Sequence, residues 1–184
     1  MDHTATLRIV LQADPIRWHV LGLVQSLALP DCWIGAGFVR NAVWDHLHGR
    51  RPTPPSGDVD VLWFDAARRD PSRDRDLEVA IRSLDPTLNW SVKNQARMHT
   101  RNGDPPYASS TDAMRHWPET ATAVAVRRTD RSHIEIAAPF GLNDLFARIV
   151  RPTLAFAGAK HPAFLDRVHK KDWLGVWPHL RLCL

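Results

Sequence analysis

Two carboxylates with strand spacing are the residues best placed to do chemistry. Asp58 and Asp60 begin an apolar run that continues to Phe64. Residues two apart in a strand project from the same face, so both carboxylates share one face while Val59 and Val61 take the other. Adjacent carboxylates repel each other, and such a pair persists best with a cation between them. Hard oxygen ligands favour Mg²⁺, usually together with phosphate oxygens, so the pair predicts a divalent-metal site.

A glycine-rich turn precedes this pair. The short apolar run 32–34 leads into Gly35-Ala36-Gly37, and an amphipathic helix is expected over 38–47. Backbone N–H groups at a helix start attract anions, and small residues let a phosphate approach the chain. Asp58 follows Gly37 by 21 residues, which is the length of one helix and a loop. Turn and carboxylates together predict metal-assisted handling of a nucleoside triphosphate.

These two features, in this order, resemble the nucleotidyltransferase superfamily of DNA polymerase β. The turn is most similar to the G-G-x-V-R-D pattern of tRNA CCA-adding enzymes and poly(A) polymerases. Here it reads Ala36-Gly37-Phe38-Val39-Arg40-Asn41, with alanine for the first glycine and asparagine for the aspartate. The segments 92–99, 117–122 and 138–145 look like a bacterial family of uncharacterised nucleotidyltransferase-like proteins, over roughly 33–177.

The resemblance implies a fold and a reaction class. The fold would be a single α+β domain with a mixed sheet flanked by helices. Asp58, Asp60 and a third acid would hold Mg²⁺, or Mn²⁺ in its place, while a nucleoside monophosphate passes from a triphosphate to an acceptor hydroxyl. The backbone at Ala36 and Gly37 would hold the terminal phosphates, and Arg40, one helical turn further on, and Asn41 would complete the nucleotide site. Arg40 could instead form a surface salt bridge. The resemblance names no acceptor.

The third acid has two candidates. Glu135 alternates correctly with Ile134 and Ile136, so its carboxylate is expected on the polar face of a strand over 133–137. We therefore assign Glu135 as the third catalytic and metal-binding acid. Glu119 lies just before a second predicted strand, over 120–126, and is the alternative. Either glutamate could instead be a solvated or structurally paired acid.

Other polar residues are candidates for the nucleotide site. Lys93, Asn94 and Arg97 place two cations and an amide within five residues, where they could bind the nucleotide, its triphosphate or the acceptor. The alternative is a polar loop with surface cations. Trp117 could stack on a base, although core packing explains most of the eight tryptophans. Arg50 and Arg51 form either a solvated helix end or a contact to phosphate or nucleic acid.

The remaining chain supplies elements that position these residues. Hydrophobic spacing predicts a helix from Pro15 to about residue 28, and further helices over 77–84, 141–150 and 160–173. A further strand is expected over 88–92, and the carboxylate strand is expected in the middle of the sheet. Residues 1–14 are expected to be a short lead. We expect one domain over 1–184, with a core of about 15–150 and a C-terminal helical segment of about 151–184.

The composition limits the class of protein and the compartment to which this chain is expected to belong. The 184 residues are 44% hydrophobic and 24% charged, with a net charge of +4, which tolerates an anionic substrate but does not establish nucleic-acid binding. Two cysteines exclude a disulfide framework. No signal peptide or membrane-spanning run is evident, so a cytoplasmic protein is expected.

Three functions are compatible with these features. The first is a Mg²⁺-dependent nucleotidyltransferase. The second is a nucleotide-binding module without catalysis, which could lack the third acid. The third is a nucleic-acid or protein interaction module on the same fold, indicated by five arginines, at positions 50, 51, 127, 128 and 131. A continuous basic path leading to the carboxylates would favour the third function.

Overall fold

The computed structural model describes residues 2–184. The N-terminal half contains α1 (His3–Gln12), α2 (Pro15–Ser26), β1 (Trp33–Gly35), α3 (Gly37–Leu47), β2 (Asp58–Trp63), α4 (Pro71–Leu84) and β3 (Asn89–Asn94). The rest contains α5 (Gln95–Asn102), α6 (Ser110–Met114), β4 (Ala125–Arg128), β5 (Ile134–Ala137), α7 (Asn143–Phe146), β6 (Ile149–Val150), the 3₁₀ helix η1 (Leu154–Phe156), α8 (His161–Lys171), α9 (Trp173–Val176) and β7 (Arg181–Leu182).

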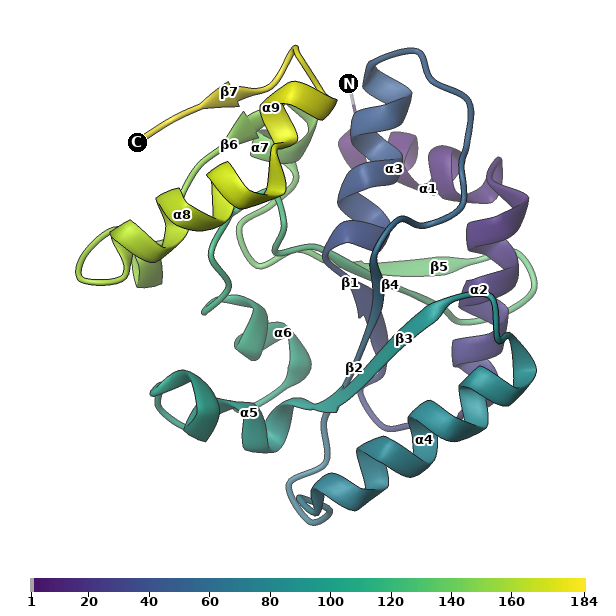
Figure 1. Ribbon diagram of the computed structural model, residues 1–184. Coiled ribbons are helices and arrows are strands. Elements are labelled where there is room, and N and C mark those ends of the chain that lie inside the picture. The colour runs from purple at the N-terminus through teal and green to yellow at the C-terminus, as the bar shows by residue number, and fades with distance from the viewer. Residues whose placement is uncertain (1) are drawn as a thin grey trace.

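Within residues 2–184, five strands form the main sheet in the order β3-β2-β1-β4-β5 (Figure 1). The β2–β3 pair is parallel and the other pairs are antiparallel. The expected α+β class, with a mixed sheet flanked by helices, is confirmed. The carboxylate strand β2 is interior, but the three-residue strand β1 takes the central place.

The two faces of the sheet carry different amounts of apolar packing. Val59, Val61 and Trp63 of β2 project into the main core, which the first four helices help to cover. The opposite face carries Asp58 and Asp60 and only a small apolar cluster, formed by residues such as Trp33, Leu62 and Met114. Burial of the first face fixes the register, because a slip by one residue would exchange the two faces. The carboxylates are thereby held on the sparsely packed face.

Several expected segments differ from the structure. The helix expected over 141–150 is helical only over Asn143–Phe146 and is followed by strand β6, and the helix expected over 77–84 begins at Pro71. The expected lead 1–14 contains helix α1, because Leu7 and Leu11 bury one helical face and Asp2 caps the first turn with 2.9 and 3.3 Å hydrogen bonds. The strand expected over 120–126 starts only at Ala125. Its first part turns instead, with the N–H of Thr122 donating to the carbonyl of Glu119 at 3.1 Å.

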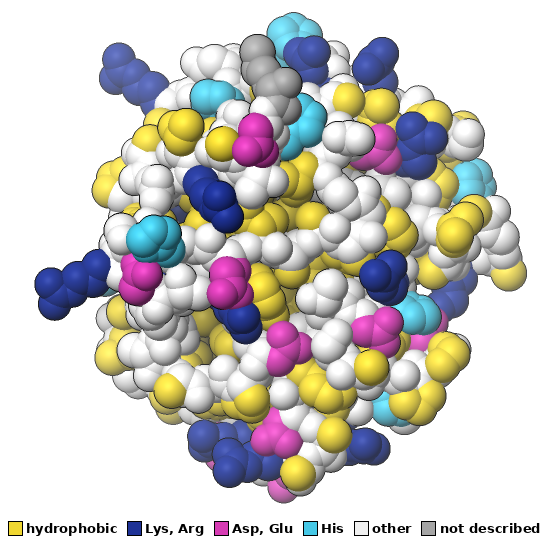
Figure 2. All heavy atoms as spheres, turned by 180° about the vertical axis from the view of Figure 1, so that it is seen from behind, with side chains coloured by type: hydrophobic (Ala, Val, Ile, Leu, Met, Phe, Trp, Pro, Cys, Tyr) yellow, Lys and Arg dark blue, Asp and Glu magenta, His cyan; other side chains and the backbone are white. Residues whose placement is uncertain are grey.

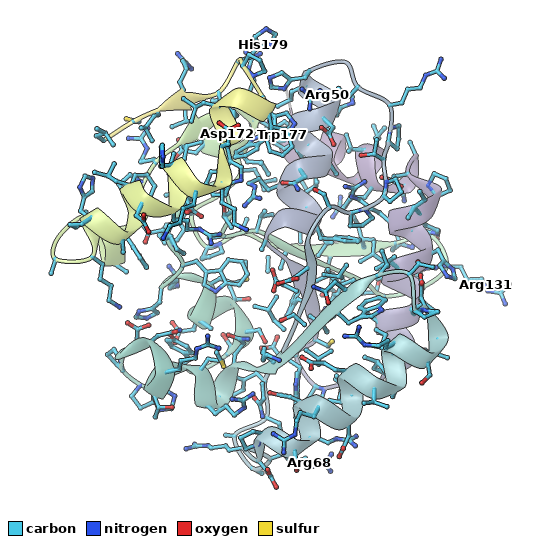
Figure 3. All side chains as sticks on the ribbon, viewed as in Figure 1. Arg50, Arg68, Arg131, Asp172, Trp177 and His179 are labelled. Atoms are coloured by element: carbon cyan, nitrogen blue, oxygen red, sulfur yellow. The ribbon has the colours of Figure 1, made fainter. Side chains whose placement is uncertain are left out.

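The C-terminal segment packs on α3. Trp177 stacks edge-on against Trp44 at 5.2 Å and donates its indole N–H to Asp45 at 2.8 Å. Arg50 donates to the carbonyl of Val176 and lies 6.0 Å from the Trp177 ring, and Figure 3 labels both residues at this junction. Arg50 is therefore occupied by a contact within the chain, which neither of the two expected interpretations anticipated.

The surface carries charges of both signs. Figure 2, which views the molecule from behind, shows Lys and Arg side chains interspersed with Asp and Glu. Of the arginines considered for an interaction module, Arg127 lies 4.3 Å from the Trp33 ring and Arg128 lies 4.7 Å from the Trp18 ring. None of the helices in residues 2–184 has the length and apolar character needed to cross a membrane.

Candidate functional site

Strand β2 presents the two carboxylates as expected. Asp60 lies opposite Ser91 of β3, and Asp58 lies opposite Asn89, whose side-chain amide donates to the Asp58 carboxylate. Asp58 is exposed, whereas Asp60 is half-buried. The strand assignment and the shared face of the pair are therefore confirmed by the geometry.

The pKa of Asp60 is raised above its ordinary value. Burial is the main cause that raises its pKa, and the neighbouring Asp58 charge raises it further. Arg167, the Ser91 hydroxyl and Arg40 act in the opposite direction but do not cancel the shift. A carboxylate that burial and a like charge both disfavour is stabilised by a bound cation.

A pocket of about 300 Å³ opens beside Asp60. Residues from strands β2 and β3, helix α5, the turn before α3 and helix α8 line this pocket, together with the segment 117–122. The lining residues are Ala36, Asp60, Val61, Leu62, Ser91, Lys93, Gln95, Met98, Arg101, Asn102, Trp117, Pro118, Thr122 and Arg167. Carboxylate, cationic, amide and aromatic groups thus meet in one hollow, as nucleotide recognition requires.

The glycine-rich turn has the local geometry of an anion site. Ala36 precedes α3 with φ 55° and ψ −126°, and its side chain cannot cap the helix. Among residues 2–184, no side chain caps the start of α3, next to the pocket residue Ala36. Gly35 is needed for close packing, because a Cβ there would lie 2.9 Å from the Trp117 ring and 3.0 Å from Leu62.

Arg40 lies beneath this turn rather than in the pocket. Its guanidinium donates to the Thr122 hydroxyl and to the Asn41 side-chain oxygen, both at 2.9 Å, and lies 4.4 Å from the Trp173 ring. Burial lowers the pKa of Arg40 to about 10, although the Glu119 and Asp60 charges oppose that shift. Both Arg40 and Asn41 are buried, so the structure places them behind the turn, where they support it.

The candidates Lys93 and Asn94, at the end of β3, and Arg97, in α5, are divided between two roles. Lys93 lines the pocket while its ammonium group contacts Glu78. Asn94 is fully buried, caps α5 through the N–H of Ala96 at 3.0 Å, and donates to the carbonyl of Arg68 at 2.7 Å. Arg97 pairs with the buried Asp74. Asn94 and Arg97 therefore hold the local fold together outside the pocket.

The structure does not bring Glu135 to the carboxylate pair. Glu135 does share the face of Asp58 and Asp60. The strand pairings place Ala137 of β5 in line with Asp60, and Glu135 lies two residues from Ala137, so its side chain projects from the same face. However, β5 is three strands from β2, and Glu135 is exposed and paired with Arg127. At about 4.8 Å between neighbouring strands, β5 and β2 are separated by roughly 14 Å across the sheet.

Glu119, the alternative third acid, is engaged by Arg167. It is 1% exposed, and its Oε1 accepts a 2.7 Å hydrogen bond from the Nε of Arg167. Within residues 2–184, no cluster of three His, Cys, Asp or Glu side chains has a geometry that could hold a metal ion. Asp58 and Asp60 nevertheless fit Mg²⁺, which can be bound by one or two carboxylates together with substrate phosphates.

Several lining residues were not found from the sequence. Gln95, Met98, Arg101 and Asn102 share one face of α5, and helical spacing could have grouped them once α5 was recognised as a helix. Trp117 was considered and does line the pocket. Arg167 had no local signal, because it reaches the pocket only through the packing of α8.

Solved structures provide a comparison for the fold. One described as revealing a CCA-adding enzyme head domain is 33% identical, with a TM-score of 0.83, covering 95% of this chain and 94% of that one. A CCA-adding enzyme in complex with CTP is 16% identical, with a TM-score of 0.58, covering 98% of this chain and 43% of that one. The Bacillus stearothermophilus CCA-adding enzyme, also in complex with CTP, is 18% identical with a TM-score of 0.50, covering 84% and 39%.

The two longer enzymes share only the fold with this chain, which spans about two fifths of their length. No curated protein matches the sequence. The nucleotidyltransferase family matches residues 22–182, a range that contains the turn, both carboxylates and α8. This match covers most of the chain, and the expected superfamily is thereby confirmed. The chain belongs to the nucleotidyltransferase family.

Proposed function

We propose that this protein is a Mg²⁺-dependent nucleotidyltransferase that transfers a nucleoside monophosphate from a triphosphate to an acceptor hydroxyl. The observation that carries the proposal is the Asp58–Asp60 pair, which shares one strand face, with Asp60 at a pocket that is also lined by Ala36, the residue before α3. Family membership supports the reaction class. The acceptor is unassigned, and a nucleic acid remains one candidate class.

The two aspartates would hold the metal ion. Bound there, Mg²⁺ would neutralise charge on the phosphates and on the leaving pyrophosphate. Mn²⁺, which also accepts carboxylate ligands, would be the natural substitute. Glu135 is left out of this proposal because of its distance from β2 and its pairing with Arg127.

The chain's own groups would orient the substrate. The first N–H groups of α3, at Gly37 and Phe38, favour a phosphate, and Arg40 adds positive charge behind them. The α5 wall and Trp117 offer amide and aromatic surfaces to a nucleobase. Positioning of the reacting groups and stabilisation of charge would account for most of the catalysis.

The test is turnover of each of the four labelled ribonucleoside triphosphates with Mg²⁺ or Mn²⁺ and a panel of acceptor hydroxyls. We expect pyrophosphate release by the wild-type protein and a loss of at least about 100-fold in Asp58→Asn and Asp60→Asn, because metal-ion catalysis stabilises several kcal/mol of transition-state charge. Unchanged turnover in both variants would contradict the assignment. Metal-dependent triphosphate binding by wild type, without turnover on any acceptor, would instead favour the catalytically inactive nucleotide binder.

A further inference from the structure

Arg167 reaches the pocket from a part of the chain that lies outside the expected catalytic core. It sits on α8, about 100 residues after Asp60, and is the only residue beyond Thr122 among those lining the pocket in the described chain. Its guanidinium lies 5.5 Å from the ring of Trp173, so an aromatic face supports it from below. Helix α8 itself is anchored in the main core through Phe164 and Val168.

One nitrogen of Arg167 fixes its orientation. The Nε donates to Oε1 of Glu119 at 2.7 Å, and the Glu119 side chain is almost completely buried. Within residues 2–184, Oε2 of Glu119 has no hydrogen-bond partner. Arg167 forms an ion pair with Glu119, and the Glu119 charge also acts on the buried Arg40. A buried carboxylate that is paired in this way is a rigid support, because loss of its partner would leave a buried charge uncompensated.

The other two nitrogens of Arg167 are free to bind. Across residues 2–184, neither terminal nitrogen of Arg167 makes a hydrogen bond, and the side chain is about one-third exposed. Arg167 and Asp60 line the same pocket. Ala36, at the start of α3, lines the same pocket. A planar fork of two N–H donors next to an uncapped helix start is suited to the paired oxygens of a phosphate.

We propose that Arg167 binds the β- and γ-phosphates of the triphosphate and that Glu119 is the residue that positions it. This inference rests on the proposed nucleotidyltransferase function and extends it to the C-terminal segment. Helix α8 thus completes the phosphate site that the turn before α3 begins. Glu119 acts through Arg167, rather than as a third metal ligand.

The test compares triphosphate and monophosphate binding in matched variants. Calorimetry with ATP, CTP, GTP and UTP in the presence of Mg²⁺ identifies the triphosphate that the wild-type protein binds, and the corresponding monophosphate is the second probe. We expect Arg167→Ala to weaken triphosphate binding at least tenfold and monophosphate binding less than twofold. Arg167→Lys, which keeps the charge without the fork, should fall between wild type and alanine.

Two further variants separate positioning from folding. Lys171→Ala removes a cation from the exposed face of the same helix and should bind both probes as the wild type does. Glu119→Gln keeps the shape but removes the charge that orients Arg167, and should weaken triphosphate binding more than monophosphate binding. Circular dichroism checks that each variant is folded, and Arg167→Lys remains informative if Glu119→Gln does not fold.

The two proposals fail in different ways. If the wild-type protein binds none of the four triphosphates, the proposed function fails and this inference fails with it. If the wild type and Arg167→Ala bind the triphosphate equally, or if Arg167→Ala weakens both probes equally, only the role of Arg167 is overturned.

Discussion

Asp60 and Glu135 project from the same face of the same sheet, yet their surroundings are opposite. Asp60 lies on an interior strand beside a pocket, with burial and Asp58 raising its pKa. Glu135 lies on the edge strand β5, exposed and paired with Arg127. The difference shows that alternation along a strand assigns a side chain to a face but not to a site. Strand order decides which acids on that face can meet.

Activity gives the sharpest test of this comparison. Asp60→Asn should lose at least about 100-fold in turnover, whereas Glu135→Gln should stay within about threefold of the wild type, since only Asp60 lies at the pocket. Single-turnover pyrophosphate release measures both. A comparable loss in Glu135→Gln would mean that β5 approaches the substrate, and would restore Glu135 as the third acid.

Gly35 lies in β1, the central strand of the sheet, and its substitution tests how tightly the residues around it are packed. A Cβ at Gly35 would lie 2.9 Å from Trp117 and 3.3 Å from the carbonyl of Val124, so Gly35→Ala should lower the free energy of unfolding by about 1–3 kcal/mol. Gly158→Ala is the control, because among residues 2–184, its immediate chain neighbours aside, no heavy atom lies within 4 Å of that Cβ. Urea denaturation compares the two variants, and equal midpoints would show that the site face is loosely packed.

The raised pKa of Asp60 predicts a pH-dependent stability difference. Between the unfolded-state pKa and the higher folded-state pKa, the native protein binds more protons, so this group's contribution falls as pH rises through that window. Without metal, Asp60→Asn should therefore gain stability relative to the wild type as pH rises from about 4.

Thermal melts across pH, with and without Mg²⁺, measure this difference. Added Mg²⁺ should raise the Tm of the wild type but not of Asp60→Asn, because a ligand stabilises only the state that binds it. A variant that is less stable than the wild type at neutral pH without metal would argue against strain at Asp60.

Ala36 offers a smaller test at the turn. Its φ of 55° with ψ of −126° is a backbone conformation that glycine adopts more readily, so Ala36→Gly should stabilise the protein by about 1 kcal/mol. Gly37→Ala is the matched control, since the nearest atom to its new Cβ would be a terminal nitrogen of Arg40 at 3.5 Å. Chemical denaturation of both variants would show whether the strain belongs to Ala36 alone.

The ion pair at the sheet edge should have the smallest effect. Breaking the exposed Arg127–Glu135 pair with Glu135→Gln should change the free energy of unfolding by only about 0–1 kcal/mol, because solvent screens it. Repeating the denaturation in 1 M salt should remove most of that difference. A larger, salt-insensitive loss would indicate that the edge strand depends on this pair.

Local pattern alone determined much of this protein. The turn at Gly35–Gly37, helix α3 and the strand that presents Asp58 and Asp60 all follow from residue spacing, because side-chain period and helix-start chemistry act over a few residues. The same reasoning placed β3 and the alternation of β5 correctly. The superfamily came instead from the resemblance of the turn and the carboxylates to a known family, which the family match supports.

Only the tertiary structure decided which distant residues join the carboxylates. Glu135 is excluded because β1 and β4 lie between β5 and β2, and Arg167 is included because α8 packs across the chain on the main core. Asn94 and Arg97 look like ligand-binding residues in the sequence, but Asn94 caps α5 and Arg97 forms an ion pair with Asp74. Strand order and helix docking depend on burying apolar surface between segments far apart in sequence, and no local spacing encodes that choice.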